Sequence, residues 1–246
     1  MTPNDGLSLS LDAPGSPYSE GEQIIFELDV ENTGQETVDT AKASLHGASF
    51  LDSSNCGGVD KEANDLSGVL KSVNQPGGKT SLVWTCSYPG SMNLREGETS
   101  PFQAGVEVTY DYETSAEAEF SVVPPEDDVG NPSSVSTDNT AAPVSADIQL
   151  SSPRAVGDQE ISVPFVIRDT GDGEVDGKVH YELTLFGDQE SGDKRLVDGS
   201  RTVTKTFDVP PVSAKTNYRP RLTLSYDYQE ELGTSFILKG LSGDQT

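Results

Sequence analysis

The chain of 246 residues is poor in basic side chains, with 16 Lys and Arg against 41 Asp and Glu, and its formal net charge is −25. A protein that binds nucleic acid through the phosphates needs a basic face, and an anionic membrane surface repels a chain this acidic. The composition therefore excludes nucleic acid as a partner and gives no reason to expect attachment to an anionic membrane.

Long apolar runs are absent too. No stretch approaches the ~20 residues that span a bilayer, so we expect no direct membrane insertion. The opening sequence MTPNDGLSLSL has neither the basic segment nor the apolar segment of a signal peptide. Either Met1 was added to a mature chain, or the protein reaches its destination without a signal, as a subunit assembled into a particle inside a cell would.

Histidine is scarce, and the motifs of catalysis are missing. The sequence contains no G-x-S-x-G, no G-x-x-x-x-G-K-S/T and no H-E-x-x-H. Of the two histidines, His46 aligns with Phe186 in the internal repeat described below, and His180 falls on the outward face of a predicted strand. We therefore predict that the chain is not an enzyme and holds no cofactor.

What the sequence does contain is alternation of apolar and polar residues with a period of two. Phe26, Leu28 and Val30 alternate with acidic residues, which is typical of a strand with one face in the core and one in water. No helical stripe of useful length occurs. The pattern predicts an all-β fold of antiparallel β-sandwiches. It recurs in residues 7–11, 106–112, 161–167, 179–185 and 222–228.

The two halves of the sequence also repeat each other. Between them, residues 124–146 are rich in Pro, Ser, Thr and Asp and show no alternation, which is typical of a linker. We predict two tandem immunoglobulin-like sandwiches, residues 1–123 and 147–246, joined by this linker. The first carries an insertion with an enlarged, Cys-containing loop, and both cysteines lie in the region that bears this insertion. The matching segments are 26–47 with 163–187, 108–120 with 224–236, and 9–14 with 148–153.

The acidic stretch RDTGDGEVDG, residues 168–177, raises the question of a calcium site. A calcium loop needs oxygen ligands at its first, third and fifth positions and an acid at the twelfth, but here Arg168 and Val179 would stand first and twelfth. In the repeat this stretch occupies the place of residues 31–40, between two strands. We therefore predict a turn. The alternative is a weak, irregular cation site at Asp169, Asp172 and Asp176.

The two cysteines lie 30 residues apart, Cys56 in a predicted loop and Cys86 in a predicted strand with Trp84 and Tyr88 on the same face. We predict a disulfide that joins the loop to the sheet, worth about 3–4 kcal/mol by loop closure. The alternative is two unrelated buried thiols. A disulfide would place the protein in an oxidising setting outside the cytosol. A zinc site would need a tight C-x-x-C spacing and nearby histidines, which are absent.

The acidic residues are spread along every segment of the chain. Such a charge destabilises the compact state by self-repulsion, and strong salt screening removes that cost. In this respect the chain resembles proteins of salt-adapted archaea; the alternative is an ordinary acidic surface protein. The second half is the less acidic one, with 17 acids and 11 bases in residues 146–246 against 20 and five in 1–123. Arg219 and Arg221 are therefore candidate contacts for an acidic partner.

The segment FELDVENTGQETV (26–38), followed by SLHG (44–47) and VEVTYDYET (106–114), resembles archaeal surface and adhesion modules of the CARDB and S-layer-related kind. The second half keeps the pattern in VIRDTGDGEV (166–175) and LSYDYQ (224–229). The resemblance implies immunoglobulin-like sandwiches, often in tandem, that serve adhesion, spacing or lattice building outside the cell. It implies no catalytic residues.

Two functions of different classes follow. The first is a non-enzymatic structural or adhesion protein on the exterior of a halophilic archaeal cell or virion, of the surface-layer, decoration, spike or turret type. Its partners would be copies of itself or other surface or virion subunits. The alternative is a carbohydrate-binding module, since sandwiches stack sugars on aromatic faces. The candidate aromatic residues are Trp84, Tyr88, Tyr218, Tyr226 and Tyr228.

Overall fold

The computed structural model describes residues 6–240 except 20, 71, 73, 89–93, 125, 128–130, 153 and 156–159. The protein is 66% strand and 2% helix, and its main sheets are antiparallel, so the predicted all-β sandwich class is confirmed. Residues 1–5, on which the prediction about Met1 and a signal peptide depends, lie outside the described residues.

The chain divides into two compact units. Among the described residues, the N-terminal unit consists of Leu7–Thr33, Thr37–Tyr110 and 229–240, and the C-terminal unit consists mainly of Gly34–Glu36 and Asp111–Tyr228. This division differs from the predicted boundaries at 123 and 146. Strands β7 (Thr99–Ala118) and β19 (Arg221–Lys239) each contribute residues to both units, so neither unit is one continuous piece of sequence.

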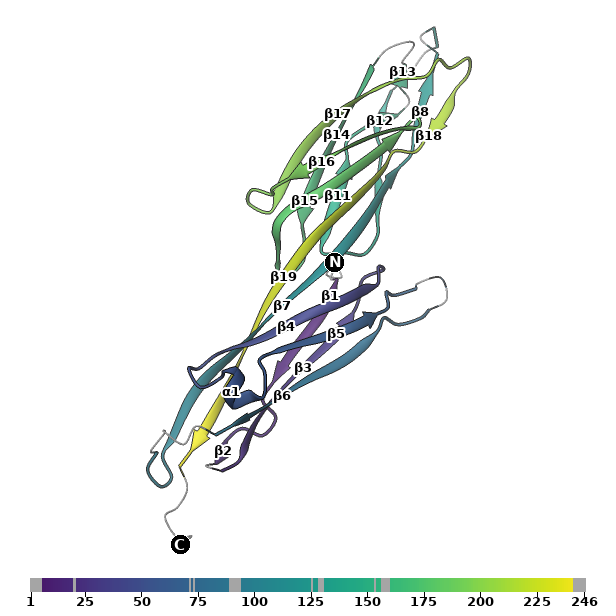
Figure 1. Ribbon diagram of the computed structural model, residues 1–246. Coiled ribbons are helices and arrows are strands. Elements are labelled where there is room, and N and C mark those ends of the chain that lie inside the picture. Colours follow the sequence, from purple (N-terminus) through teal and green to yellow (C-terminus); the bar gives the residue numbers. More distant parts are fainter. Residues whose placement is uncertain are drawn as a thin grey trace. The chain divides into compact units, whose positions relative to one another are not determined.

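In the N-terminal unit, one sheet has the strand order β1-β3-β6 and the other places β5, β4, β7 and β19 side by side (Figure 1). The short strand β2 pairs with the end of β19, and the helical turn α1 follows β4. The bounds are β1 Leu7–Asp12, β2 Tyr18–Ser19, β3 Gln23–Asn32, β4 Val38–Gly47, α1 Ser53–Cys56, β5 Asp60–Leu66 and β6 Lys79–Ser87.

Alternation in β3 explains how this unit forms its core. Ile24, Phe26, Leu28 and Val30 are buried, whereas the residues between them face outward. Phe26 meets Phe236 of β19 edge to face, with ring centroids 5.2 Å apart. The inner faces of the two sheets therefore meet in one aromatic and aliphatic core, as in a β-sandwich.

The C-terminal unit is built in the same way. One sheet has the order β11-β14-β17, and the other places β16, β15, β19, β7 and β10 side by side; two small ladders, β13-β8-β18 and β12-β9, complete it. Phe165 of β14 contacts Tyr181 of β15, with centroids 5.3 Å apart. The bounds are β8 Phe120–Val123, β9 Ser133–Ser134, β10 Thr137–Asn139, β11 Val144–Ile148, β12 Ser151–Ser152, β13 Arg154–Ala155, β14 Glu160–Asp169, β15 Glu174–Leu185, β16 Asp188–Lys194, β17 Ser200–Asp208 and β18 Thr216–Tyr218.

The segment predicted as a linker is folded into the C-terminal unit wherever the structure describes it from residue 133 onward. Strand β10 pairs with residues 116–118 of β7, and β11 pairs with β14. Thr137 and Asn139 accept hydrogen bonds from the backbone N–H groups of Ile148 and Ala146 at 2.8 Å each. Polar side chains rather than apolar alternation hold β10, which explains why the sequence pattern missed it.

Candidate functional site

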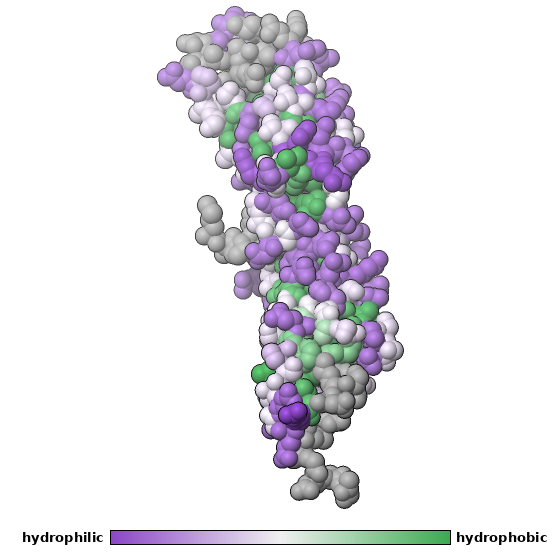
Figure 2. Space-filling view, turned by 90° about the vertical axis from the view of Figure 1, so that its left-hand side faces the viewer, coloured by the Kyte–Doolittle hydropathy of each residue, from purple (hydrophilic) through white to green (hydrophobic). Residues whose placement is uncertain are grey.

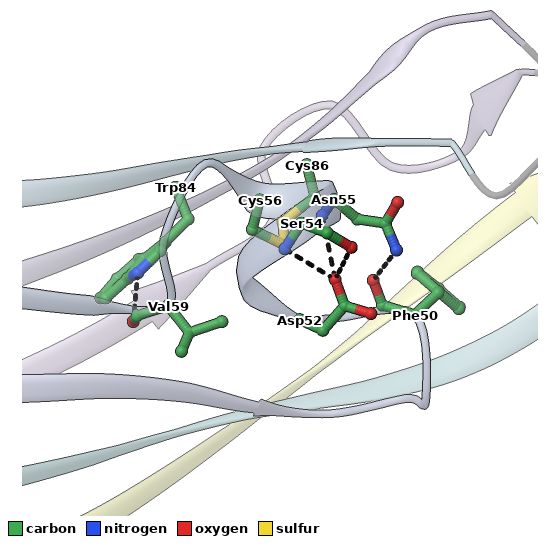
Figure 3. Close-up of a disulfide and its surroundings, with 8 residues drawn as sticks. All are labelled: Phe50, Asp52, Ser54, Asn55, Cys56, Val59, Trp84 and Cys86. Atoms are coloured by element: carbon green, nitrogen blue, oxygen red, sulfur yellow. Dashed lines mark hydrogen bonds between the residues drawn. A yellow bond between two sulfur atoms is a disulfide. The ribbon is translucent and has the colours of Figure 1, made fainter.

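The enlarged loop of the N-terminal unit is organised around α1. The Asp52 side chain accepts hydrogen bonds from the backbone of Ser54 and Asn55, both at 2.9 Å, and so caps the helical turn (Figure 3). The hydrogen bond from the Ser54 hydroxyl, together with these two backbone bonds, lowers the pKa of Asp52. Gly57 ends the turn in the left-handed conformation that glycine adopts without strain. The turn thus presents Cys56 in one fixed direction.

The predicted disulfide between Cys56 and Cys86 is confirmed. Cys86 has no exposed surface on β6, and Cys56 is buried at the end of α1, so the bond joins the loop to the core face of a strand (Figure 3). Next to it the Trp84 ring nitrogen donates a hydrogen bond to the Val59 carbonyl at 2.7 Å. The loop is therefore attached to β6 both by the disulfide and by the hydrogen bond to the Val59 carbonyl.

The aromatic residues predicted to stack on a sugar do not form a surface platform. Trp84 of β6 is fully buried in the core, and Tyr88, directly after β6, is 9% exposed. Tyr226 and Tyr228 are buried as well. A ring covered on both faces by protein offers no face to a ligand, so the prediction is corrected for these four residues.

Tyr218 is the one predicted stacking residue that keeps partial exposure. Its ring lies against Phe186 at 4.6 Å, edge to face, and 6.2 Å from Phe120. Phe186 occupies the left-handed backbone region at φ 57°, in the turn between β15 and β16. The Tyr218 ring therefore belongs to a small aromatic cluster at a loop rather than to an open platform.

Arg219 and Arg221, the predicted contacts for an acidic partner, are both exposed and both paired within the chain. Arg219 donates two hydrogen bonds to one Glu119 oxygen at 2.7 and 2.8 Å, and Arg221 binds Glu117 at 2.6 Å. The Glu119 carboxylate raises the pKa of Arg219. With their charges balanced by these carboxylates, the two arginines attract an acidic neighbour less than free ones would. They border a hollow of about 400 Å³ beside Phe186.

The acidic turn after β14 has a structural role. Tyr228 donates a hydrogen bond to Asp169 at 3.0 Å and accepts one from the Gly173 backbone at 3.0 Å. Burial raises the pKa of Asp169. Asp172 and Asp176 are exposed, and no three His, Cys, Asp or Glu side chains among the described residues lie together so as to hold a metal ion. The side chain of Asp169 therefore fastens the turn through its bond with Tyr228.

Sequence reasoning missed a hollow of about 750 Å³ with a mixed polar and apolar lining in the C-terminal unit. It lies over the outward faces of β11, β14 and β17, where hydroxyl and amide side chains gather. Two of its lining residues, Ser134 and Val135, lie in the segment predicted as a linker, where no strand was expected. The sequence signal for the hollow was the alternation of the polar residues Asp147, Gln149 and Ser151 with apolar ones. Its lining is Ser134, Val135, Asp147, Ile148, Gln149, Leu150, Ser151, Ser162, Pro164 and Thr204.

Both histidines lie at the surface beside carboxylates. His180 is 2.8 Å from Asp193, whose pKa it lowers, and His46 is 3.5 Å from Glu231. Both side chains are close to half exposed, and each imidazole lies against a carboxylate. Across the described parts of the chain, no helix is long and apolar enough to cross a membrane.

Comparison with known proteins identifies no family: no family profile matches the chain, and no curated protein does. Among solved structures, a crystal structure of a Salmonella alpha-2-macroglobulin mutant is similar at 11% sequence identity with a TM-score of 0.22. That match covers 92% of this chain and 16% of the other, so the chain spans about a sixth of the length of that protein.

Proposed function

We propose that the protein is a non-enzymatic structural or adhesion protein on the exterior of a salt-adapted archaeal cell or virion, of the surface-layer, decoration, spike or turret type. The observation that carries the proposal is the sharing of β7 and β19 by both units. Each unit takes strands from both halves of the chain, so two strands rather than one linker run from one unit into the other, an arrangement that suits a load-bearing protein.

The surface chemistry supports the same role. The face drawn in Figure 2 is mostly hydrophilic, with hydrophobic residues in separate small areas. On adjacent strands of the C-terminal unit, Asp111 and Asp227 are close enough that Asp111 raises the pKa of Asp227, with burial the larger cause. Repulsion of this kind is tolerated best where concentrated salt screens it. The disulfide supports a location outside the cytosol.

The proposal is tested by incubating fluorescently labelled protein with envelope and virion fractions of halophilic archaea in multimolar salt. We expect the protein to sediment with one of these fractions and to remain in solution without them. A protein that binds no fraction and forms no assembly at any salt concentration would contradict the proposal.

The two arginines are tested in the same assay. If they touch an acidic partner despite their internal pairs, Arg219→Glu with Arg221→Glu weakens binding at least about tenfold, as loss of two charge contacts does. Arg201→Glu with Lys178→Glu is the control of equal charge change, since both residues are exposed on other strands. Equal binding of the two double variants would remove these arginines from the interface.

Carbohydrate binding is the second candidate function, and the hydroxyl and amide groups in the hollow over β11, β14 and β17 favour it. Hydroxyl and amide groups on a largely uncharged surface match the hydroxyl groups of a neutral sugar better than the acidic faces elsewhere do. A glycan array in high salt tests this, with Ser162→Arg to obstruct the hollow and Ser191→Arg on exposed β16 as its control. Signals that are lost with Ser162→Arg and kept with Ser191→Arg would support sugar binding in the hollow. An array on which the natural chain gives no signal would exclude this candidate function.

A further inference from the structure

The final strand of the N-terminal unit comes from the far end of the chain. Residues 229–239 of β19 lie beside β7 in that unit, but they follow residues 221–228, which belong to the C-terminal unit. The C-terminal unit in turn takes a strand from the first half of the chain. Residues 111–118 of β7 lie in this unit beside its part of β19. Each half of the repeated sequence therefore fills the last strand position of the other half's sandwich.

Residues 229–239, here called the donor segment, fill a slot in the core of the N-terminal unit. Phe236 and Leu238 have no exposed surface. The Phe236 ring contacts Phe26 at 5.2 Å, Phe102 at 5.8 Å and Phe50 at 6.2 Å. Without the donor segment these three rings would lose their common neighbour, so the slot is apolar and shaped for an aromatic side chain.

The edges of the slot fix the register of the donor segment. Leu238 is opposite Tyr18 in the parallel pairing with β2, and the Ile237 backbone N–H donates to the Ser16 hydroxyl at 2.9 Å. At its end, Gly240 donates to the Glu98 carbonyl at 3.0 Å. A Cβ on Gly240 would lie 2.3 Å from the Arg95 carbonyl oxygen, so only glycine fits there.

We propose that this slot also accepts the donor segment of a second copy of the chain, so that copies join by exchanging this strand. The register, which the donor segment satisfies, indicates this occupant, and so does the precedent inside the chain, where the two halves already exchange strands. Exchange keeps the contacts between the donor segment and the slot and changes which chain supplies the segment. The exchanged form is therefore favoured as the concentration of chains rises.

The inference goes beyond the proposed surface role and does not rest on it, because exchange is measured on the purified full-length chain. Side chains across β7 and the donor segment provide the probe. Gln229 donates to Glu107 at 2.8 Å, and both residues lie at the surface of the N-terminal unit. Glu107→Cys is placed in one chain and Gln229→Cys in another, so that the two introduced thiols meet only when a donor segment enters the second copy.

The two variants are unfolded together in acid without reductant, which keeps the Cys56–Cys86 bond intact, then refolded in high salt at high protein concentration and oxidised. We expect a disulfide-linked dimer that joins the two introduced thiols, identified by peptide mass spectrometry. Its yield should exceed that of a control mixture, Glu107→Cys with Ser191→Cys, by roughly tenfold or more, because only the first pair is held side by side. Ser191 is an exposed residue of β16.

A second pair of introduced cysteines keeps the test valid if one of the first two variants does not fold. Gln103 and Ser235 are in contact at 3.4 Å across the same two strands, and both are exposed. Gln103→Cys with Ser235→Cys should give the same linked dimer. If neither pair gives more linked dimer than the control, in chains whose circular dichroism shows native strand content, strand exchange between copies is excluded.

Discussion

At the scale of residues, two Tyr-Asp-Tyr motifs organise both units. In residues 110–112 and 226–228 the first tyrosine accepts a hydrogen bond from the start of a strand, Leu7 at 3.4 Å and Val144 at 3.2 Å. The second tyrosine accepts one from the turn that follows the paired strand, Glu36 after β3 at 3.3 Å and Gly173 after β14 at 3.0 Å. Burial raises the pKa of Tyr112 to about 12, so its hydroxyl remains a donor at neutral pH.

Removing one of these hydroxyl groups tests the role of the motif. Tyr228→Phe should lower the free energy of unfolding by about 1–2 kcal/mol, because the Gly173 N–H and the Asp169 carboxylate both lose a partner at a half-buried site. Urea denaturation measures the change. Tyr218→Phe is the control, since that ring lies in a partly exposed cluster; an equal loss in both variants would contradict this role of the Tyr228 hydroxyl.

The pair of Asp111 and Asp227 predicts a dependence on pH. The folded pKa of Asp227 is raised above its ordinary value of 3.8, by burial and by Asp111, so the folded state holds this proton more tightly. The stabilising contribution of that proton is present below about pH 3.8 and is lost as the pH rises through the folded pKa. Asp227→Asn should therefore unfold at a higher temperature than the natural chain at pH 7.

This gain should shrink as the pH falls below 3.8, where Asp227 is protonated in both states, and should also shrink in molar salt, which screens the repulsion. Thermal melts at several pH values and salt concentrations measure both trends. A gain that is the same at pH 3 and pH 7 would show that the charge of the Asp227 carboxylate is not its cause.

At the scale of elements, the sequence pattern predicted strands better than connections. Burial alternates in β3 and β14 as the apolar residues alternate, because a strand must bury one face. The polar strand β10 was missed, since hydrogen bonds from side chains hold it. The sequence did not lead us to predict that β7 and β19 are shared between the units. A signal was present, because the alternation from Val106 continues to Ala118. It makes β7 20 residues long, longer than most strands in globular proteins.

The disulfide predicts a clear effect on the N-terminal unit. Replacing Cys56 and Cys86 together by alanine should lower the free energy of unfolding by about 3–4 kcal/mol, because the unfolded chain regains the freedom of the loop between them. Denaturation of the variant, and of the natural chain with and without reductant, measures this. Reductant should leave the variant unchanged; an effect of the same size on the variant would assign the loss to something other than this bond.

The donor segment predicts a second effect on the same unit. Phe236→Ala should lower the free energy of unfolding by about 3–5 kcal/mol, because it leaves a cavity between Phe26, Phe50 and Phe102. Ile237→Ala is the neighbouring control, since that side chain is 39% exposed and points outward. Comparable losses in the two variants would contradict the packing of Phe236 described above.

At the scale of the whole molecule, the repeat was visible in the sequence, but the way its halves share strands was not. Alternation identifies which face of a strand is buried, but it does not identify the unit in which each part of a long strand is buried. The same limit applies to the candidate sites, of which some were predicted correctly and others were not. Spacing and register predicted the Cys56–Cys86 bond correctly, whereas Trp84 and Tyr88, predicted as ligand-stacking residues, are buried.

The central claim is that this acidic chain assembles with itself or with surface partners in concentrated salt. Light scattering of the purified protein across a salt series, with and without reductant, tests it most directly. The account predicts a molar mass that rises with salt above the 26.1 kDa of one chain, to a defined multimer. A mass of one chain at every salt concentration, together with no binding to envelope or virion fractions, would contradict it.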